Sequence, residues 1–281
     1  MKKLIILCCF IISSAVYSQN TMLVSSPDGN LTVNVLVKNG KPVYSITYKG
    51  SVVLEESPLG LITNEGDFSA NMIFENSSIA KVQEDYTQTK IKQSKVSYNA
   101  NTLNCLFTNA KKQKIAILFQ VSNNNIAFRY EIPAWGDTKV CVVTEETTGY
   151  KFPSTTTTFL SPMMQAMTGF ARTAPSYESG YEADAPLDKN NASDGYVFPG
   201  LFHLGDKAWV LLSEAGVSSL YTASHLSGYK DGLYTVEYPN PKQNNGFGSS
   251  GGQIGLPGVT PWRTITVGET LKPIVETTIP F

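Results

Sequence analysis

The chain has 281 residues, a formal net charge of −1 and a hydrophobic content of 42%. This length accommodates one large domain or two small ones, and the apolar content is sufficient for a buried core. The sequence has no block of Lys and Arg residues, which argues against binding to nucleic acid or to an anionic membrane surface, because both need clustered positive charge.

Residues 1–18 are typical of a signal peptide. Lys2 and Lys3 precede an apolar run over residues 4–12, and Val16-Tyr17-Ser18 matches a cleavage site. The run is too short to span a bilayer as a helix. An N-terminal core strand is the alternative interpretation, but the two lysines favour export. We therefore expect a periplasmic or secreted protein whose mature domain comprises residues 19–281.

Two cysteines, Cys105 and Cys141, follow the predicted signal peptide. An exported protein can form a disulfide. Each cysteine lies in a strand-like stretch, however, where a buried free thiol fits the pattern equally well. The sequence therefore leaves a disulfide and two buried thiols open as alternatives.

From residue 22 onward, hydrophobic residues recur with the period of two that indicates β-strands. The pattern is clearest over Leu31–Val37, which lies between turns at Ser26-Pro27-Asp28-Gly29 and Asn39-Gly40. Further strands are predicted over Val43–Tyr48, Ser51–Leu54, Lys90–Tyr98, Thr102–Thr108, Lys114–Val121, Ile126–Ile132, Thr155–Leu160, Ala208–Glu214, Leu233–Tyr238 and Thr264–Val267. One short helix is compatible with the pattern over Met163–Ala171.

Many short strands separated by Gly, Pro and Asn residues predict an all-β fold, a large antiparallel sandwich. No linker rich in Ser, Gly or Pro divides the middle of the chain, so we expect a single domain after the signal peptide. Residues 163–207 interrupt the regular strand pattern with a long, turn-rich stretch. Connections of this length are usually functional or disordered.

Within that stretch, acidic and aromatic residues cluster over Tyr177–Asp184. The cluster contains Glu178 and Glu182, and carboxylate oxygens on a loop suit Ca²⁺. A solvated acidic loop with its tyrosines packed against the domain is the alternative. Asp188–Gly195 resembles a calcium loop only faintly, because the closing glutamate of such a loop is missing.

Paired carboxylates could serve a glycosidase, which needs two of them across a cleft. Glu55-Glu56, Glu145-Glu146 and Glu178 with Glu182 are the pairs available by residue type. Neighbours along a strand point to opposite faces, so we expect Glu145 and Glu146 to have a surface role. The two histidines, His203 and His225, lack partners at zinc-ligand spacing.

The three tryptophans are the remaining signals. Trp209 lies in an apolar stretch and is expected in the core. Trp262-Arg263 differs because it follows a Gly/Pro loop over residues 251–261. This pair could stack on and hydrogen-bond a polar ligand such as a sugar, or anchor the domain to a neighbour.

Several segments taken together resemble the N-terminal domain of glycoside hydrolase family 97. They are Ser25-Ser26-Pro27-Asp28-Gly29-Asn30-Leu31, Ala127-Phe128-Arg129-Tyr130, Tyr177-Glu178 with Tyr181, Leu211-Leu212-Ser213-Glu214-Ala215, and Thr260-Pro261-Trp262-Arg263. Their order and spacing extend the resemblance over nearly the whole mature chain.

The resemblance implies a β-supersandwich like that of galactose mutarotase, packed against a catalytic (β/α)₈ barrel. Members of the family cleave α-glucosidic or α-galactosidic bonds with calcium. The barrel supplies the catalytic carboxylates and most calcium ligands, and one glutamate comes from the N-terminal domain. Glu178 is the residue that we match to it, with Glu182 second.

No strand–helix alternation of a barrel is present. We therefore expect no catalytic residue in this chain, which would be a truncated or split gene product or an excised domain. Trp262 and Arg263 are expected to bind substrate near the cleft or the interface. The alternative is a stand-alone carbohydrate-binding module that uses exposed Trp and Tyr side chains. A mutarotase-like epimerase would need a His and a Glu facing one pocket.

Overall fold

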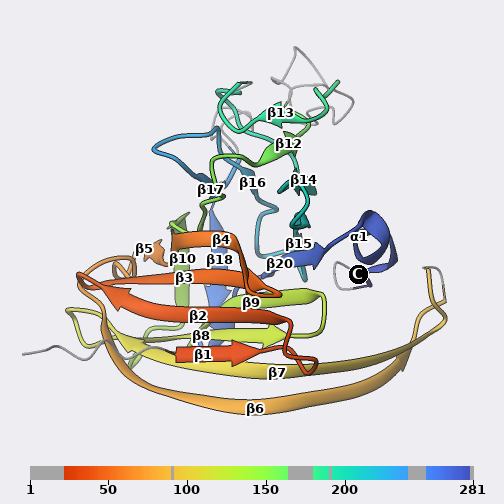
Figure 1. The fold of residues 1–281 in the computed structure, drawn as a ribbon. Helices are drawn as coiled ribbons and strands as arrows, with labels where there is room; N and C mark the ends of the chain where they lie inside the picture. The colour runs from red at the N-terminus through yellow and green to blue at the C-terminus, as the bar shows by residue number, and fades with distance from the viewer. Residues whose placement is uncertain (1–21, 90–91, 164–179, 190–191, 240–250, 279–281) are drawn as a thin grey trace, which may run out of the picture.

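The computed structural model describes residues 22–89, 92–163, 180–189, 192–239 and 251–278, and it consists almost entirely of β-strands (Figure 1). The strands are β1 (Met22–Ser25), β2 (Leu31–Lys38), β3 (Lys41–Tyr48), β4 (Ser51–Pro58), β5 (Leu61–Thr63), β6 (Ile73–Thr87), β7 (Lys95–Thr108), β8 (Lys114–Val121), β9 (Asn125–Ile132), β10 (Val140–Glu146), β11 (Gly149–Tyr150), β12 (Thr157–Phe159), β13 (Ala185–Pro186), β14 (Gly200–His203), β15 (Trp209–Ala215), β16 (His225–Leu226), β17 (Tyr234–Glu237), β18 (Gly252–Gly255), β19 (Gly258–Val259) and β20 (Trp262–Gly268). This confirms the predicted all-β sandwich.

One large antiparallel sheet organises the domain. Its strand order is β13-β12-β14-β15-β20-β9-β8-β7-β6, and β19 adds to β9. Three smaller sheets, with the orders β1-β2-β3-β4, β18-β10-β5 and β11-β17-β16, pack against one face of it. The core lies between these two layers.

Side-chain alternation explains how the layers meet. In β8, the side chains of Ile115, Ile117, Phe119 and Val121 are buried, and the residues between them are not. Tyr44 of β3 crosses from the smaller sheets, and its ring centroid lies 6.1 Å from that of Phe119. The same alternation leaves the opposite side of the large sheet, called the outer face below, outside the sandwich.

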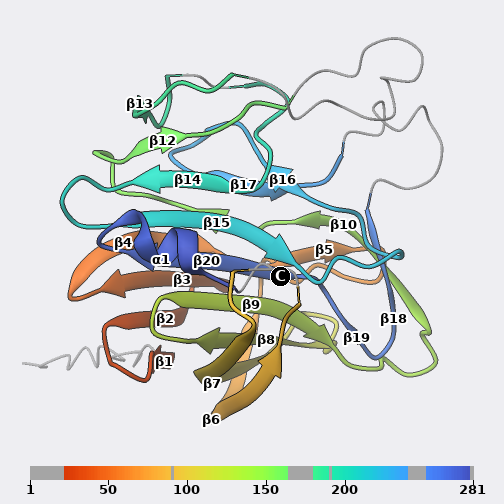
Figure 2. The same cartoon turned by 90° about the vertical axis from the view of Figure 1, so that its right-hand side faces the viewer.

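Figure 2 looks onto the outer face, with the one helix of the described chain in front of β20. This helix, α1 (Leu271–Glu276), packs against β20 and β15 and buries Ile274. Thr270 caps its N-terminus by accepting a hydrogen bond from the Lys272 amide. The sequence pattern did not predict α1, because six residues are too short for helical periodicity to show.

A long hairpin of β6 and β7 extends past β8 and curls toward the outer face (Figure 1). Its tip contacts the segment after α1, where the Lys92 Nζ donates to the Thr277 carbonyl over 3.0 Å. β7 is one continuous strand, whereas the pattern predicted two. β6 was not predicted, because nearly all its side chains are exposed and it shows no apolar alternation.

The cysteine alternatives are resolved in favour of two free thiols. Cys105 and Cys141 are both buried and unbridged. Burial raises the pKa of the Cys105 thiol to about 12. The predicted helix over Met163–Ala171 lies outside the described residues, except for Met163. No helix in the described part is long and apolar enough to cross a membrane.

Both thiols are therefore expected to resist alkylation in the folded protein. At pH 8, a pKa of about 12 leaves on the order of one Cys105 side chain in ten thousand as the reactive thiolate. Labelling with iodoacetamide followed by peptide mass spectrometry should find Cys105 and Cys141 unmodified without denaturant and fully modified in denaturant. Rapid labelling of the folded protein would show that this part of the core opens.

Candidate functional site

Trp262 begins β20 on the outer face of the large sheet. Its side chain is half-buried, and the guanidinium carbon of Arg129 lies 4.3 Å from the centroid of its ring. Arg129 also pairs with Glu131, with 2.8 Å between Nη2 and Oε1. A cation over an indole ring is a favourable contact. One face of the Trp262 ring is therefore covered by Arg129.

A hollow of about 320 Å³ lies beside Trp262, and the curled β6–β7 hairpin forms its wall. Its lining residues are Val82, Glu84, Tyr86, Tyr98, Gln120, Ala127, Ala215, Trp262, Thr264 and Thr278. Burial raises the pKa of Tyr98 to about 12, so its hydroxyl stays neutral and donates to Gln120 over 3.0 Å. Aromatic and polar side chains thus converge at Trp262, as a binding surface for a polar ligand requires.

Arg263, the next residue, points to the opposite face and is 1% exposed. Its Nε and Nη2 donate to the two carboxylate oxygens of Glu146 over 2.9 and 2.6 Å. Its Nη1 donates to Glu214 over 2.6 Å. Burial acts to lower the pKa of Arg263, but the two carboxylates raise it well above its ordinary value. The side chain therefore stays charged and ties β20 of the large sheet to β10 of a smaller one.

Substrate binding by Arg263 stays a prediction. In this structure every nitrogen of its guanidinium has an internal acceptor. An arginine in this setting acts as a structural cross-link, which is the second role expected for the Trp262-Arg263 pair. A clue was present in the sequence, since Arg263 alternates with Ile265 and Val267 and so shares their buried face.

The expectation for Glu145 and Glu146 was partly wrong. Glu145 is exposed, but Glu146 is only 2% exposed and is the main partner of Arg263. The pairing of β10 with β5 shifts register between Val143 and Glu145. Such a bulge re-aims side chains, so that Glu146 and not Glu145 continues the buried side of β10 after Val143.

The acidic cluster is only partly described, because Glu178 lies outside the described residues. Glu182 is exposed and forms an ion pair with Lys189. Beside it, Tyr181 is 60% exposed and lies against Phe159 of β12. Tyr181, Glu182 and Lys189 border a hollow of about 660 Å³ that is also lined by Leu160, Pro162, Gly180, Ala192 and Tyr196.

Aromatic side chains continue from this cluster along the outer face. Phe159 contacts Trp209, and Trp209 stacks on His203 with 3.9 Å between ring centroids. Trp209 is therefore a half-buried residue of the outer face rather than a core residue. Asp184 accepts hydrogen bonds from Thr157 and His203, which hold its pKa below the ordinary value.

The structure thus brings two predicted regions to one surface. Trp262 pairs with Ala215 at one end of β15, and Trp209 pairs with Gly268 at the other. Six residues of strand separate the two positions, which corresponds to about 20 Å. The outer face therefore carries Trp262 at one end and the aromatic group beside Glu182 at the other.

A calcium site would need several oxygen ligands. Within the described ranges, no group of three or more His, Cys, Asp or Glu side chains could hold a metal ion. A single glutamate fits as one ligand, and the remaining ligands would have to lie outside these ranges. The described residues by themselves therefore do not form a metal centre.

Comparison with known proteins assigns the family. The family model described as glycosyl-hydrolase 97 N-terminal matches residues 24–281. A solved β-arabinopyranosidase superposes with a TM-score of 0.88 at 49% identity, over 92% of this chain and 42% of that chain. A glycoside hydrolase family 97 enzyme from Pseudoalteromonas sp., solved in complex with panose, gives a TM-score of 0.77 at 23% identity, over 92% of this chain and 37% of that chain.

A curated relative, described as a probable retaining alpha-galactosidase from Streptomyces bingchenggensis, is 24% identical over 261 residues. That match covers 90% of this chain and 36% of the relative. The chain belongs to glycoside hydrolase family 97, as its N-terminal domain. It spans only 36 to 42% of the length of these three relatives.

Proposed function

We propose that this chain is the non-catalytic N-terminal domain of an exported, calcium-dependent glycoside hydrolase. The observation that carries the proposal is the match of the family's N-terminal model to residues 24–281. The domain would form one wall of an active-site cleft, and a catalytic (β/α)₈ barrel would supply the catalytic carboxylates. Glu178 would contribute one calcium ligand, and Trp262 would lie near the cleft or the interface.

For the substrate we propose glycosides of galactose configuration. The relatives include a solved β-arabinopyranosidase and a curated probable α-galactosidase. A β-L-arabinopyranoside has the ring configuration of an α-D-galactopyranoside and lacks only its hydroxymethyl group. One active site can therefore accept both glycosides, and selectivity between them depends on the pocket around the hydroxymethyl group. An α-glucosidic substrate is the alternative within the same family.

The surface of α1 supports a covering partner. Leu271 and Val275 are four residues apart, so they lie on one side of the helix, and they are 42% and 64% exposed. Paired apolar side chains on a helix surface are suited to burial against another domain. A stand-alone carbohydrate-binding module, the rival function, would not require this helix face to be covered.

A domain exchange tests the proposal. The N-terminal domain of the 49% identical β-arabinopyranosidase is replaced by this chain without its first 18 residues. We expect the chimera to hydrolyse p-nitrophenyl β-L-arabinopyranoside or α-D-galactopyranoside with calcium, and this chain alone to show no turnover. Glu178→Gln should lower kcat/KM and calcium affinity by about tenfold or more, because it removes a metal ligand.

Glu182→Gln is the matched control, since Glu182 is an exposed carboxylate four residues away that pairs with Lys189. It should leave calcium affinity unchanged. If calcium affinity falls in Glu182→Gln and not in Glu178→Gln, Glu182 is the calcium ligand instead. Enzyme-like turnover by this chain alone would refute the proposal. A chimera whose activity is unchanged by both substitutions and by removal of calcium with a chelator would refute it as well.

A further inference from the structure

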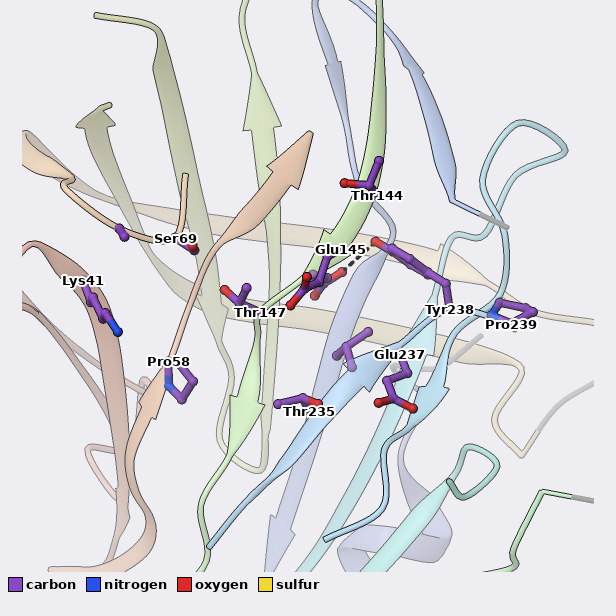
Figure 3. A pocket seen from close by; sticks show the side chains of 13 residues that line it. Lys41, Pro58, Ser69, Thr144, Glu145, Thr147, Thr235, Glu237, Tyr238 and Pro239 are labelled. Atoms are coloured by element: carbon purple, nitrogen blue, oxygen red, sulfur yellow. Dashed lines mark hydrogen bonds between the residues drawn. The ribbon is translucent and has the colours of Figure 1, made fainter. Parts of the chain in front are cut away.

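A third hollow lies away from the outer face, between the smaller sheets. It has a volume of about 740 Å³, within the range of small-molecule sites. Residues 144–147 run between Lys41 and Pro58 on one side and Thr235 and Glu237 on the other (Figure 3). The remaining lining residues are Ser69, Ala70, Val236, Tyr238 and Pro239.

The charged groups that line this hollow are mostly carboxylates. Glu145 is exposed, and its carboxylate has no hydrogen-bond or ion-pair partner in the part of the chain that the structure describes. The side chain of Glu237, across the hollow, is 49% exposed, and one of its carboxylate oxygens lies 3.6 Å from Nε2 of the buried His225. Lys41 is the single cation among the thirteen lining residues. Two accessible carboxylates against one amine disfavour phosphate and other anions.

The hollow is held in shape by the buried Arg263 cluster. Glu146, next to Glu145, is fixed by two hydrogen bonds from Arg263. Tyr238 donates to Glu146 over 3.4 Å, the bond drawn as a dashed line in Figure 3, and its hydroxyl lies 2.6 Å from that of Tyr221. A site supported by such a network is pre-organised, which limits the ordering cost of binding.

Apolar surfaces complete the lining. Pro58, Pro239 and Tyr238 line the hollow together with the hydroxyl-bearing residues Ser69, Thr144 and Thr235. Carboxylates accept hydrogen bonds from hydroxyl groups, and flat apolar side chains pack against C–H groups. A sugar offers both kinds of surface at close spacing and carries no charge.

We propose that this hollow binds a neutral mono- or disaccharide. Sugar hydroxyls donate to the carboxylates of Glu145 and Glu237, Lys41 donates to a sugar oxygen, and the C–H face of the ring packs on Tyr238 and the prolines. This function needs no catalytic partner, so it goes beyond the proposed role in hydrolysis and does not depend on it.

The test measures binding to the purified chain by isothermal titration and by ligand-observed NMR. The probes are methyl α-D-galactopyranoside, methyl β-L-arabinopyranoside, melibiose and maltose, with spermidine as a cationic comparison. We expect at least one saccharide to bind with a dissociation constant near or below about 1 mM. The double substitution Glu145→Ala and Glu237→Ala should weaken it about tenfold or more, because it removes two charged acceptors.

Glu56→Ala is the matched control, since Glu56 is an exposed glutamate that pairs with Lys38 and lines none of the three hollows described above. It should leave the affinity unchanged. The proposal is overturned if no saccharide binds with a dissociation constant near or below about 1 mM, if only spermidine binds, or if Glu56→Ala or Trp262→Ala removes binding while the double substitution does not. Circular dichroism of each variant shows that a loss of affinity is not a loss of fold. Inactivity of the chimera would leave this result intact, because binding is measured without the barrel.

Discussion

Replacing Arg263 with methionine is expected to lower the free energy of unfolding by about 3–5 kcal/mol. The substitution leaves the carboxylate of Glu146, whose side chain is fully buried, without its charged partner. It also removes the bond to Glu214, whose side chain is 12% exposed. An unpaired charge in a core is among the costliest defects that a single substitution can create. Urea denaturation followed by tryptophan fluorescence measures the change.

Lys151→Met is the control for Arg263→Met. Lys151 pairs with Glu55 over 3.1 Å, and the two side chains are 44% and 40% exposed, so water screens the pair. Its loss should change stability by less than about 1 kcal/mol. Adding Glu146→Gln to Arg263→Met should recover part of the loss, since the buried charge disappears. Equal effects of Arg263→Met and Lys151→Met would contradict the structural role assigned to this cluster.

Replacing Gly195 with alanine is expected to cost about 2–5 kcal/mol, the second large effect. The residue has φ of +81°, and an added Cβ would lie 2.1 Å from the Leu226 carbonyl oxygen and 2.8 Å from His225 Cδ2. A left-handed conformation costs a non-glycine residue about 1–2 kcal/mol, and an overpacked site about 1–3 kcal/mol more. Thermal and urea unfolding of the variant measure the loss.

Gly205→Ala separates the two contributions to this cost. Gly205 also has a positive φ, +57°, but a Cβ there would meet no atom within 4 Å. We expect only the backbone cost of about 1–2 kcal/mol. The difference between the variants reports the close approach of Gly195 to β16. That approach fixes the chain just before Tyr196, which lines the hollow beside Glu182. Equal losses of stability in Gly195→Ala and Gly205→Ala would show that the close approach of Gly195 to β16 adds nothing to the cost.

The fold was largely predictable because strand alternation is a local property. β8 was predicted at its observed bounds, and β9 within one residue, since every second side chain of these strands enters the core. β6 was missed for the opposite reason, because an exposed strand has no hydrophobic alternation to detect. Most strands of two to four residues, such as β13 and β16, were missed because so few residues cannot establish a period. β12 and β17 are the exceptions, since they lie within the predicted segments Thr155–Leu160 and Leu233–Tyr238.

The candidate site was predictable only in part. The Gly/Pro loop before Trp262 marked a residue that does lie on the outer face beside a hollow. The same reasoning placed Arg263 with it, although adjacent residues of a strand face opposite ways and Arg263 enters the core. The bulge in β10 could not be predicted from the sequence either, because no residue type in 143–146 signals the register shift.

The sequence by itself determined the all-β class, most of the central strands and the membership of glycoside hydrolase family 97, because periodicity and ordered segments are read along the chain. Only the tertiary structure decided which charges are buried together. Glu146 and Arg263 are 117 residues apart and meet through two hydrogen bonds. The contribution of that pair to stability depends on how completely water is excluded from it. The exclusion of water is set by the packing of two sheets, and not by the neighbours of either residue in the chain.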